Sequence, residues 1–101
     1  MTVVTVLYPA GDGATFDHEY YTASHMPMVE RLWGPLGMTD ARVLRGVPGP
    51  DGKGPPFVVM TNLTWPDAGS FAKAAQAHGA EIFRDIRNFT NIRAQTQVSE
   101  G

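Results

Sequence analysis

The chain contains no cysteine, and this absence excludes three kinds of chemistry. No disulfide can stabilise the fold, no thiolate can act as a nucleophile, and no metal can be held by cysteine sulfur. The sequence also has no run approaching about 18 consecutive apolar residues, the length that would indicate a membrane span. Its first residues lead directly into a strand-like segment rather than a signal peptide. We therefore expect no membrane association and a cytoplasmic protein.

The sequence also lacks a large excess of positive or negative charge. Eight Lys and Arg stand against ten Asp and Glu, which gives a formal net charge of −2. The densest basic cluster consists of Arg84, Arg87 and Arg93, and it is interrupted by Asp85 and by apolar positions. Because nucleic-acid binding leaves a continuous basic surface, we expect no nucleic-acid partner.

Motifs for phosphates and metals are absent as well. Neither Gly11-Asp12-Gly13 nor the turn-rich segment 49–56 has the strand-to-helix pattern of a nucleotide site. The three histidines, His18, His25 and His78, do not occur at a spacing typical of metal ligands. The sequence therefore predicts no metal and no cofactor.

What remains is the composition of one folded domain, residues 1–101, in which 43% of the residues are hydrophobic. Periodicity and turn residues predict strands at 2–8, 39–47, 57–65 and 90–98. Helices are predicted at 17–33 and 66–87, with an interruption of the second at Gly79. The order strand, helix, strand, strand, helix, strand predicts an α+β, ferredoxin-like βαββαβ fold. Its four-stranded antiparallel sheet would carry both helices on one face.

The first and third strands are apolar on both faces. Val3 and Leu7 alternate with Val4, Val6 and Tyr8, whereas helices can cover only one face of the sheet. The other face would expose more contiguous apolar surface than soluble monomers usually show. We therefore expect a homodimer whose sheets pack face to face.

The first helix carries an inward-facing histidine. Tyr21, His25 and Met28 share the helix face that continues to Leu32. An imidazole buried there needs either a buried partner or a wet cavity. Pro27 cannot donate a hydrogen bond to Ala23, so either the helix kinks or a new helix begins with Ser24 as its cap.

Two segments resemble the EthD family. These are Tyr20-Tyr21-Thr22-Ala23-Ser24-His25-Met26-Pro27-Met28 and the tail from Asp85-Ile86-Arg87-Asn88-Phe89-Thr90-Asn91 to Val98-Ser99-Glu100. The resemblance covers nearly the whole chain and implies a dimeric α+β barrel with a cavity between sheet and helices. The wider group of such barrels includes cofactor-independent oxygenases, isomerases, decarboxylases and haem enzymes, so the resemblance leaves the reaction open.

His25 is the leading candidate for catalysis, because a neutral imidazole can take a proton from a phenol or a carbon acid. The alternative is a structural histidine bonded to a backbone carbonyl that Pro27 leaves free. Tyr21 shares the face of His25 and is expected to orient a ligand. The candidate ligand-binding residues are Tyr20, Met28, His78 and Phe83. Core packing near the helix end is the favoured alternative for His78, and core or dimer-interface packing is the favoured alternative for Met28 and Phe83.

Asp85 allows two interpretations from sequence: it either orients a histidine or pairs with Arg84 or Arg87 at the surface. Three functions remain open at this level. The first is an oxidoreductase of the cofactor-independent oxygenase type, or a related proton-transfer enzyme, acting on an apolar or aromatic molecule. The second is a non-catalytic carrier or accessory protein of a catabolic oxygenase pathway. The third is haem binding through His25.

Overall fold

The computed structural model describes all 101 residues, Met1–Gly101. Its four strands form one antiparallel sheet in the order β2-β3-β1-β4. The strands are β1 (Thr2–Pro9), β2 (Asp40–Arg45), β3 (Phe57–Trp65) and β4 (Gln95–Glu100). The two most apolar strands, β1 and β3, are therefore central, and the predicted ferredoxin-like topology is confirmed.

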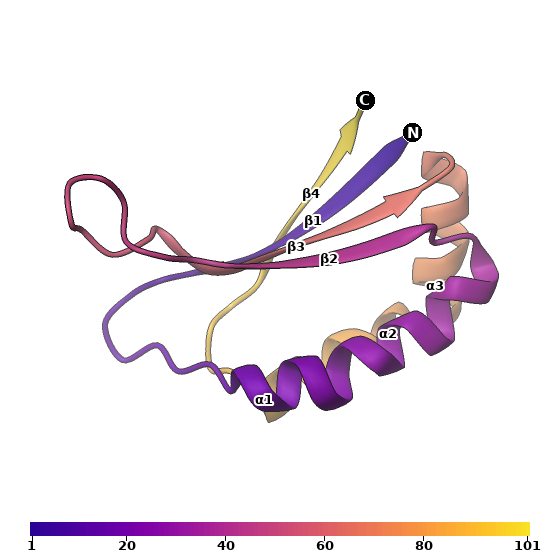
Figure 1. The fold of residues 1–101 in the computed structure, drawn as a ribbon. Coiled ribbons are helices and arrows are strands. Elements are labelled where there is room, and N and C mark those ends of the chain that lie inside the picture. Colours follow the sequence, from indigo (N-terminus) through magenta and orange to yellow (C-terminus); the bar gives the residue numbers. More distant parts are fainter.

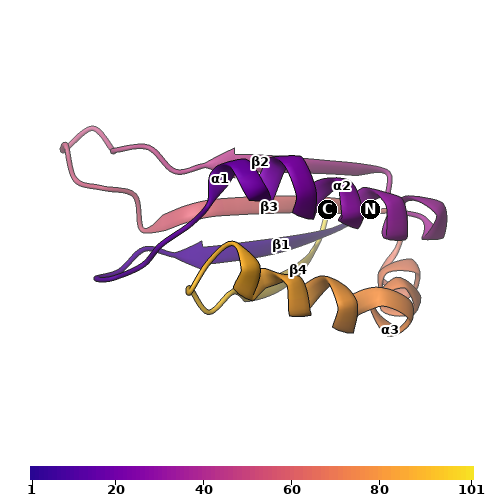
Figure 2. The same ribbon diagram turned by 90° about the horizontal axis from the view of Figure 1, so that it is seen from below.

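Two helical segments cover one face of this sheet (Figure 1). The first consists of α1 (His18–Tyr20), a π-helical turn (Tyr21–His25) and α2 (Met26–Trp33). The second is α3 (Ala68–Arg84), followed by a 3₁₀ turn (Asp85–Asn88). Seen from the helical side, the two segments run next to each other across the sheet (Figure 2). The opposite face of the sheet is bare.

Both helical segments begin at an aspartate, as the sequence predicts. Asp17 accepts a hydrogen bond from the Tyr20 amide (3.0 Å), and Asp67 accepts one from the Ser70 amide (2.7 Å). Each side chain satisfies an amide that the first helical turn leaves without a partner. These caps fix where the helices start above the sheet.

The strand register separates the two faces. On the helix side, Val4 lies opposite Leu63 and Tyr8 lies opposite Val59, and all four are buried. The core continues into the helices and contains, among others, Tyr21, Met26, Val29, Trp33, Trp65, Ala74, Ile82 and Phe89. On the bare side, Leu7 lies opposite Met60. On the same side, Thr5 lies opposite Asn62 and Val3 lies opposite Thr64, so the predicted second apolar face is present only in part.

Two predicted boundaries are wrong. Gly79 does not interrupt α3, because the cost of a helical glycine, about 1 kcal/mol, is small beside the packing of a buried helix. The last strand begins at Gln95 rather than Thr90. Thr90 instead accepts a hydrogen bond from the Ile92 amide (3.0 Å), which turns the chain before β4 starts. No helix is both long and apolar enough to cross a bilayer.

Candidate functional site

The helical segment is irregular at the position of His25. Residues Tyr21–His25 form a π-helical turn, in which the Met26 amide bonds to the carbonyl of Tyr21. Pro27 follows in the first turn of α2, and Ser24 does not cap that helix. Of the two outcomes considered from sequence, a new helix with Pro27 in its first turn is the closer one, but Ser24 is not its cap. Single π turns inside α-helices are frequent at functional sites.

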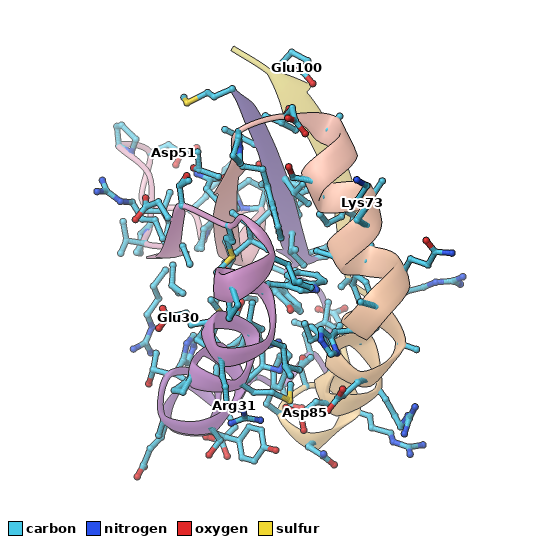
Figure 3. All side chains as sticks on the ribbon, turned by 90° about the vertical axis from the view of Figure 1, so that its right-hand side faces the viewer. Glu30, Arg31, Asp51, Lys73, Asp85 and Glu100 are labelled. Carbon is cyan, nitrogen blue, oxygen red and sulfur yellow. The ribbon has the colours of Figure 1, made fainter.

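His25 is buried, at 4% exposure, and its partner is Asp85 at the end of the other helical segment. The distance from His25 Nδ1 to Asp85 Oδ2 is 2.9 Å. Asp85 lies at the foot of α3, beside the first helical segment (Figure 3). The contact joins residues 60 positions apart. The α3 terminus therefore fixes the ring that the first helical segment carries.

Two further groups hold the Asp85 carboxylate. The Tyr20 hydroxyl donates to Oδ1 (2.8 Å), and the Asn88 amide donates to the same oxygen (2.9 Å). The other carboxylate oxygen, Oδ2, bonds to His25. Of the two interpretations of Asp85 from sequence, histidine orientation is the one observed, and neither Arg84 nor Arg87 forms an ion pair with it.

This geometry assigns the tautomer of His25. A carboxylate can only accept hydrogen bonds, so a neutral His25 carries its proton on Nδ1 and donates it to Asp85. The one hydrogen bond of the ring uses Nδ1, and the other ring nitrogen, Nε2, has no partner within the chain. It therefore has a free lone pair, the arrangement of a general base whose second nitrogen is held by an acid.

The pKa values agree with this assignment. Burial lowers the pKa of His25 below its usual 6.5, and the hydrogen bond and charge of Asp85 offset this effect only in part. Desolvation raises the pKa of Asp85, but hydrogen bonds from Asn88, His25 and Tyr20 outweigh it and the pKa is lowered. At neutral pH the pair is thus a neutral imidazole beside a carboxylate.

Tyr21 lies against His25 on the same turn. The two rings are stacked, with centroids 5.3 Å apart, and the ring of Phe89 packs against both at a tilted angle. The Tyr21 hydroxyl shares a 2.6 Å hydrogen bond with Thr61 Oγ1 on β3. Burial raises the pKa of Tyr21, so its hydroxyl stays neutral and can donate or accept. The π-helical turn and β3 thus each contribute one hydroxyl, from Tyr21 and Thr61, to a hydrogen-bonded pair.

His25 and Tyr21 line an apolar cavity between the sheet and the helices. Its walls are formed by β1, β3 and both helical segments: Val4, Val6, Tyr8, Tyr21, His25, Met26, Val29, Trp33, Thr61, Leu63, Phe71, Ile82, Phe83 and Ile86. The free volume is about 20 Å³. That is room for one water molecule, whereas sites for small organic ligands usually have about 300–1,000 Å³.

Phe83 belongs to the outer wall of the cavity. It lines the cavity and yet is 42% exposed. It is the only exposed residue of the cavity wall, so it separates the cavity from solvent. Phe83 also lines a second, open groove together with Ile86, so the two hollows share a wall.

The other predicted ligand residues lie elsewhere. Tyr20 is directed to Asp85 and does not line the cavity. Met28 packs against the core from outside, and His78 lies near Glu81 on α3, with 3.6 Å between its Nδ1 and a carboxylate oxygen. Thr61 is a cavity residue that sequence reasoning missed. Its position in the helix-facing row of β3 is the signal that would have found it.

In the closed cavity a haem does not fit beside His25, and neither does any other ring system. Axial ligation would require the porphyrin to lie directly against Nε2, where the cavity has only about 20 Å³. Core side chains such as Val29 and Ile82 fill the surrounding space.

Comparison with known proteins identifies the family. Neither a family model nor a curated protein sequence matches the chain. A solved structure of an EthD-like protein from Ralstonia eutropha JMP134 shares 41% identity with a TM-score of 0.90, over 98% of this chain and 89% of that one. The chain belongs to the EthD-like family. The resemblance seen in the sequence is thereby confirmed.

More distant structures show the fold alone. An EthD family protein from Bacillus halodurans C-125 is 22% identical, with a TM-score of 0.71 over 100% of this chain and 98% of that one. SnoaB, a cofactor-independent oxygenase from Streptomyces nogalater, is 14% identical, with a TM-score of 0.64 over 99% of this chain and 90% of that one. Oxygenase and EthD-like chains therefore share the architecture in which His25 is placed.

Proposed function

We propose that this EthD-like chain is a cofactor-independent oxygenase, or a closely related proton-transfer enzyme, with His25 as its base. The observation that carries the proposal is the unpartnered Nε2 of a neutral imidazole in the wall of an apolar cavity. Asp85 positions the ring, and the hydroxyls of Tyr21 and Thr61, which are bonded to each other, belong to residues of the same cavity wall and would orient the substrate by exchanging this bond. The fold shared with SnoaB supports the reaction class.

The step that this arrangement supports begins with a carbon acid. Nε2 takes a proton from an activated CH₂ group, and the resulting carbanion gives its electrons to O₂. A C–O bond forms, the O–O bond then breaks, and the carbon becomes a ketone. The second proton and the proton held by His25 leave with the departing oxygen as water. One CH₂ and one O₂ thus give one C=O and one H₂O, and no electron donor is needed.

The small size of the cavity limits what can enter. About 20 Å³ accommodates a water molecule or a molecule of similar size beside Nε2, but no aromatic ring. We expect the substrate to displace Phe83, which is partly exposed and closes the cavity. Met26, which also lines the cavity, is flexible enough to adapt its shape to a flat ring.

Oxygen uptake tests the proposal, with the hydroxylated anthrone dithranol as the substrate, because its ring CH₂ is acidic. Wild-type protein should accelerate uptake and form the quinone. We expect His25→Gln to lower kcat about 10²-fold or more, the usual contribution of a general base. Glu30→Gln, an exposed change on α2, is the matched control and should leave kcat unchanged. Equal rates for wild type and His25→Gln would contradict the role of His25.

We infer further that the chain works as a homodimer. On the bare sheet face, Leu7, Met60 and Leu44 are paired as an apolar patch toward one end of the central strands, whereas Thr5 and Asn62 are hydrogen-bonded to each other at the middle. In a dimer with two-fold symmetry, this face of one subunit packs against the same face of the other. Helices occupy the other face, so such a dimer would leave the His25 cavity of each subunit accessible.

A non-catalytic carrier is the second candidate function. It is favoured by the small number of polar groups in the cavity wall, where Thr61 and the rings of Tyr8, Tyr21 and His25 stand among aliphatic and aromatic side chains. A carrier would bind dithranol without accelerating its oxidation, so the same assay separates the two functions.

A further inference from the structure

An open groove adjoins the His25 cavity at the end of α3. Its volume is about 450 Å³, within the range of small-molecule sites, in contrast to the cavity itself. The 3₁₀ turn after α3 and the segment that leads into β4 form its walls: Phe83, Arg84, Ile86, Arg87, Thr90, Asn91, Ile92, Arg93 and Ala94. Phe83 and Ile86 belong to both hollows.

The charge of this groove has one sign. Arg84, Arg87 and Arg93 line it, and no acidic residue does. None of the three forms an ion pair, since both ion pairs of the chain involve histidines. The nearest carboxylate in sequence, Asp85, is directed away to His25, Tyr20 and Asn88. Three cations thus remain without a counter-ion in a chain whose net charge is −2.

The remaining walls are partly apolar. Ile86 and Ile92 are half-buried, and Phe83 offers a ring face at the border with the cavity. A ligand that binds both to the arginines and to the apolar side chains of the groove carries a negative group at one end and an apolar body at the other. Arginine suits the negative end, because its planar fork bonds two oxygens of a carboxylate at once.

We propose that this arginine groove binds the acid group of an amphipathic organic anion, whose apolar end passes Phe83 to reach His25. The inference rests on the proposed function and adds a substrate class to it: an aromatic or otherwise apolar molecule with one carboxylate. It also explains how an aromatic substrate could use a cavity that is too small to hold it. The groove holds most of the substrate, and the cavity receives only the reacting edge.

A matched pair of fluorescent probes tests this inference. 8-Anilinonaphthalene-1-sulfonate is an aromatic anion, and N-phenyl-1-naphthylamine has the same rings without the sulfonate. Both are titrated against wild type and against a groove variant with Arg84→Gln, Arg87→Gln and Arg93→Gln. A control variant carries Arg31→Gln, Lys53→Gln and Lys73→Gln, exposed positions outside the groove, and so loses the same charge.

We expect the Kd of the sulfonate to rise about tenfold or more in the groove variant, since charge-assisted hydrogen bonds are lost there. The control variant should bind the sulfonate as wild type does, and the naphthylamine should bind all three proteins equally. Amide shifts in a ¹H–¹⁵N spectrum should locate the sulfonate near Ile86 and Ile92.

Three results would overturn the inference: equal sulfonate binding by wild type and groove variant, binding of neither probe by wild type, or sulfonate contacts on the bare sheet face. The proposed function fails by a different measurement, oxygen uptake by His25→Gln, which does not enter this binding assay. The two failures are therefore distinguishable.

Discussion

At the residue scale, the protonation of His25 decides what the site can do. Nδ1 is bound to Asp85, and Nε2 is free beside the cavity. Because burial lowers the pKa of His25, the ring remains a base at neutral pH. Tyr20 and Asn88 contribute indirectly, through the Asp85 oxygen that they share.

Asp85→Asn should reverse the tautomer. Tyr20 and Asn88 both donate to Oδ1, so the amide oxygen of the new asparagine takes that place and its NH₂ group faces Nδ1. His25 must then accept at Nδ1 and carry its proton on Nε2, where it cannot act as a base. We expect kcat for dithranol oxidation to fall about 10²-fold or more, with little change in KM.

Tyr20→Phe is the comparison for this prediction. It removes one of the two donors to Oδ1 but leaves the carboxylate, so the loss of kcat should be much smaller. If Asp85→Asn retained the wild-type kcat, Asp85 would have no positioning role.

Stability should decrease as the pH falls below about 6.5. The folded chain holds His25 neutral with a lowered pKa, so the unfolded chain binds the proton more readily. The contribution of His25 is therefore fully present above pH 6.5, its unfolded value, and is lost on acidification. Urea titrations at pH 7.5 and 5.5 should show a lower midpoint at pH 5.5.

The variant His25→Gln should lack most of this pH dependence. His18→Gln is the comparison: burial lowers the pKa of His18 too, so this variant should also lose part of the pH dependence, but a smaller part, because His18 is not among the buried residues. A wild type equally stable at both pH values would contradict a buried neutral His25.

At the scale of secondary-structure elements, the sequence predicts order and faces better than it predicts irregularities. Period-two alternation identifies both faces of β1 and β3, and Asp17 and Asp67 mark both helix starts. The π-helical turn at Tyr21–His25 leaves no such signal, because Pro27 is equally compatible with a kink or a new helix.

The candidate site, too, could be predicted only in part from the sequence. The helix face of Tyr21 and His25 is readable from spacing, whereas the Asp85 contact depends on how two helical segments pack side by side. No local pattern encodes a partner 60 residues away. Tyr20 is an example of what the sequence does not predict. Tyr21 lines the cavity, whereas the neighbouring Tyr20 bonds to Asp85 instead.

Gly79→Ala should stabilise the chain. Gly79 lies within α3, and an added Cβ would meet only the Ala75 side chain, at an ordinary 3.7 Å. Alanine is favoured over glycine inside a helix by about 0.5–1 kcal/mol. Urea denaturation should therefore give a higher free energy of unfolding.

Gly46→Ala provides the contrast. Its added Cβ would overlap the Phe57 carbonyl oxygen, so the β2–β3 pairing would have to shift, and stability should fall. Destabilisation by Gly79→Ala would mean that α3 is interrupted there after all.

At the scale of the whole molecule, the bare sheet face predicts assembly. Leu7 and Met60 are paired on this face, and no element of this chain covers the face. A charge there would be buried without a partner between two sheets, so Leu7→Glu should convert dimer into monomer. Light scattering at micromolar concentration measures the mass directly.

Leu36→Glu is the matched control, because Leu36 is 41% exposed in the turn after α2 and lies outside the sheet. It should remain dimeric. A wild-type protein that is monomeric at micromolar concentration would contradict the predicted assembly.

The most direct test of the proposed base is a long-range ¹H–¹⁵N NMR spectrum of the His25 imidazole in the wild-type protein at pH 7.5. Nδ1 should show the nitrogen shift of a protonated ring nitrogen, and Nε2 that of an unprotonated one. A proton on Nε2 or a doubly protonated ring would contradict the assignment, because His25 would then have no lone pair to offer a substrate.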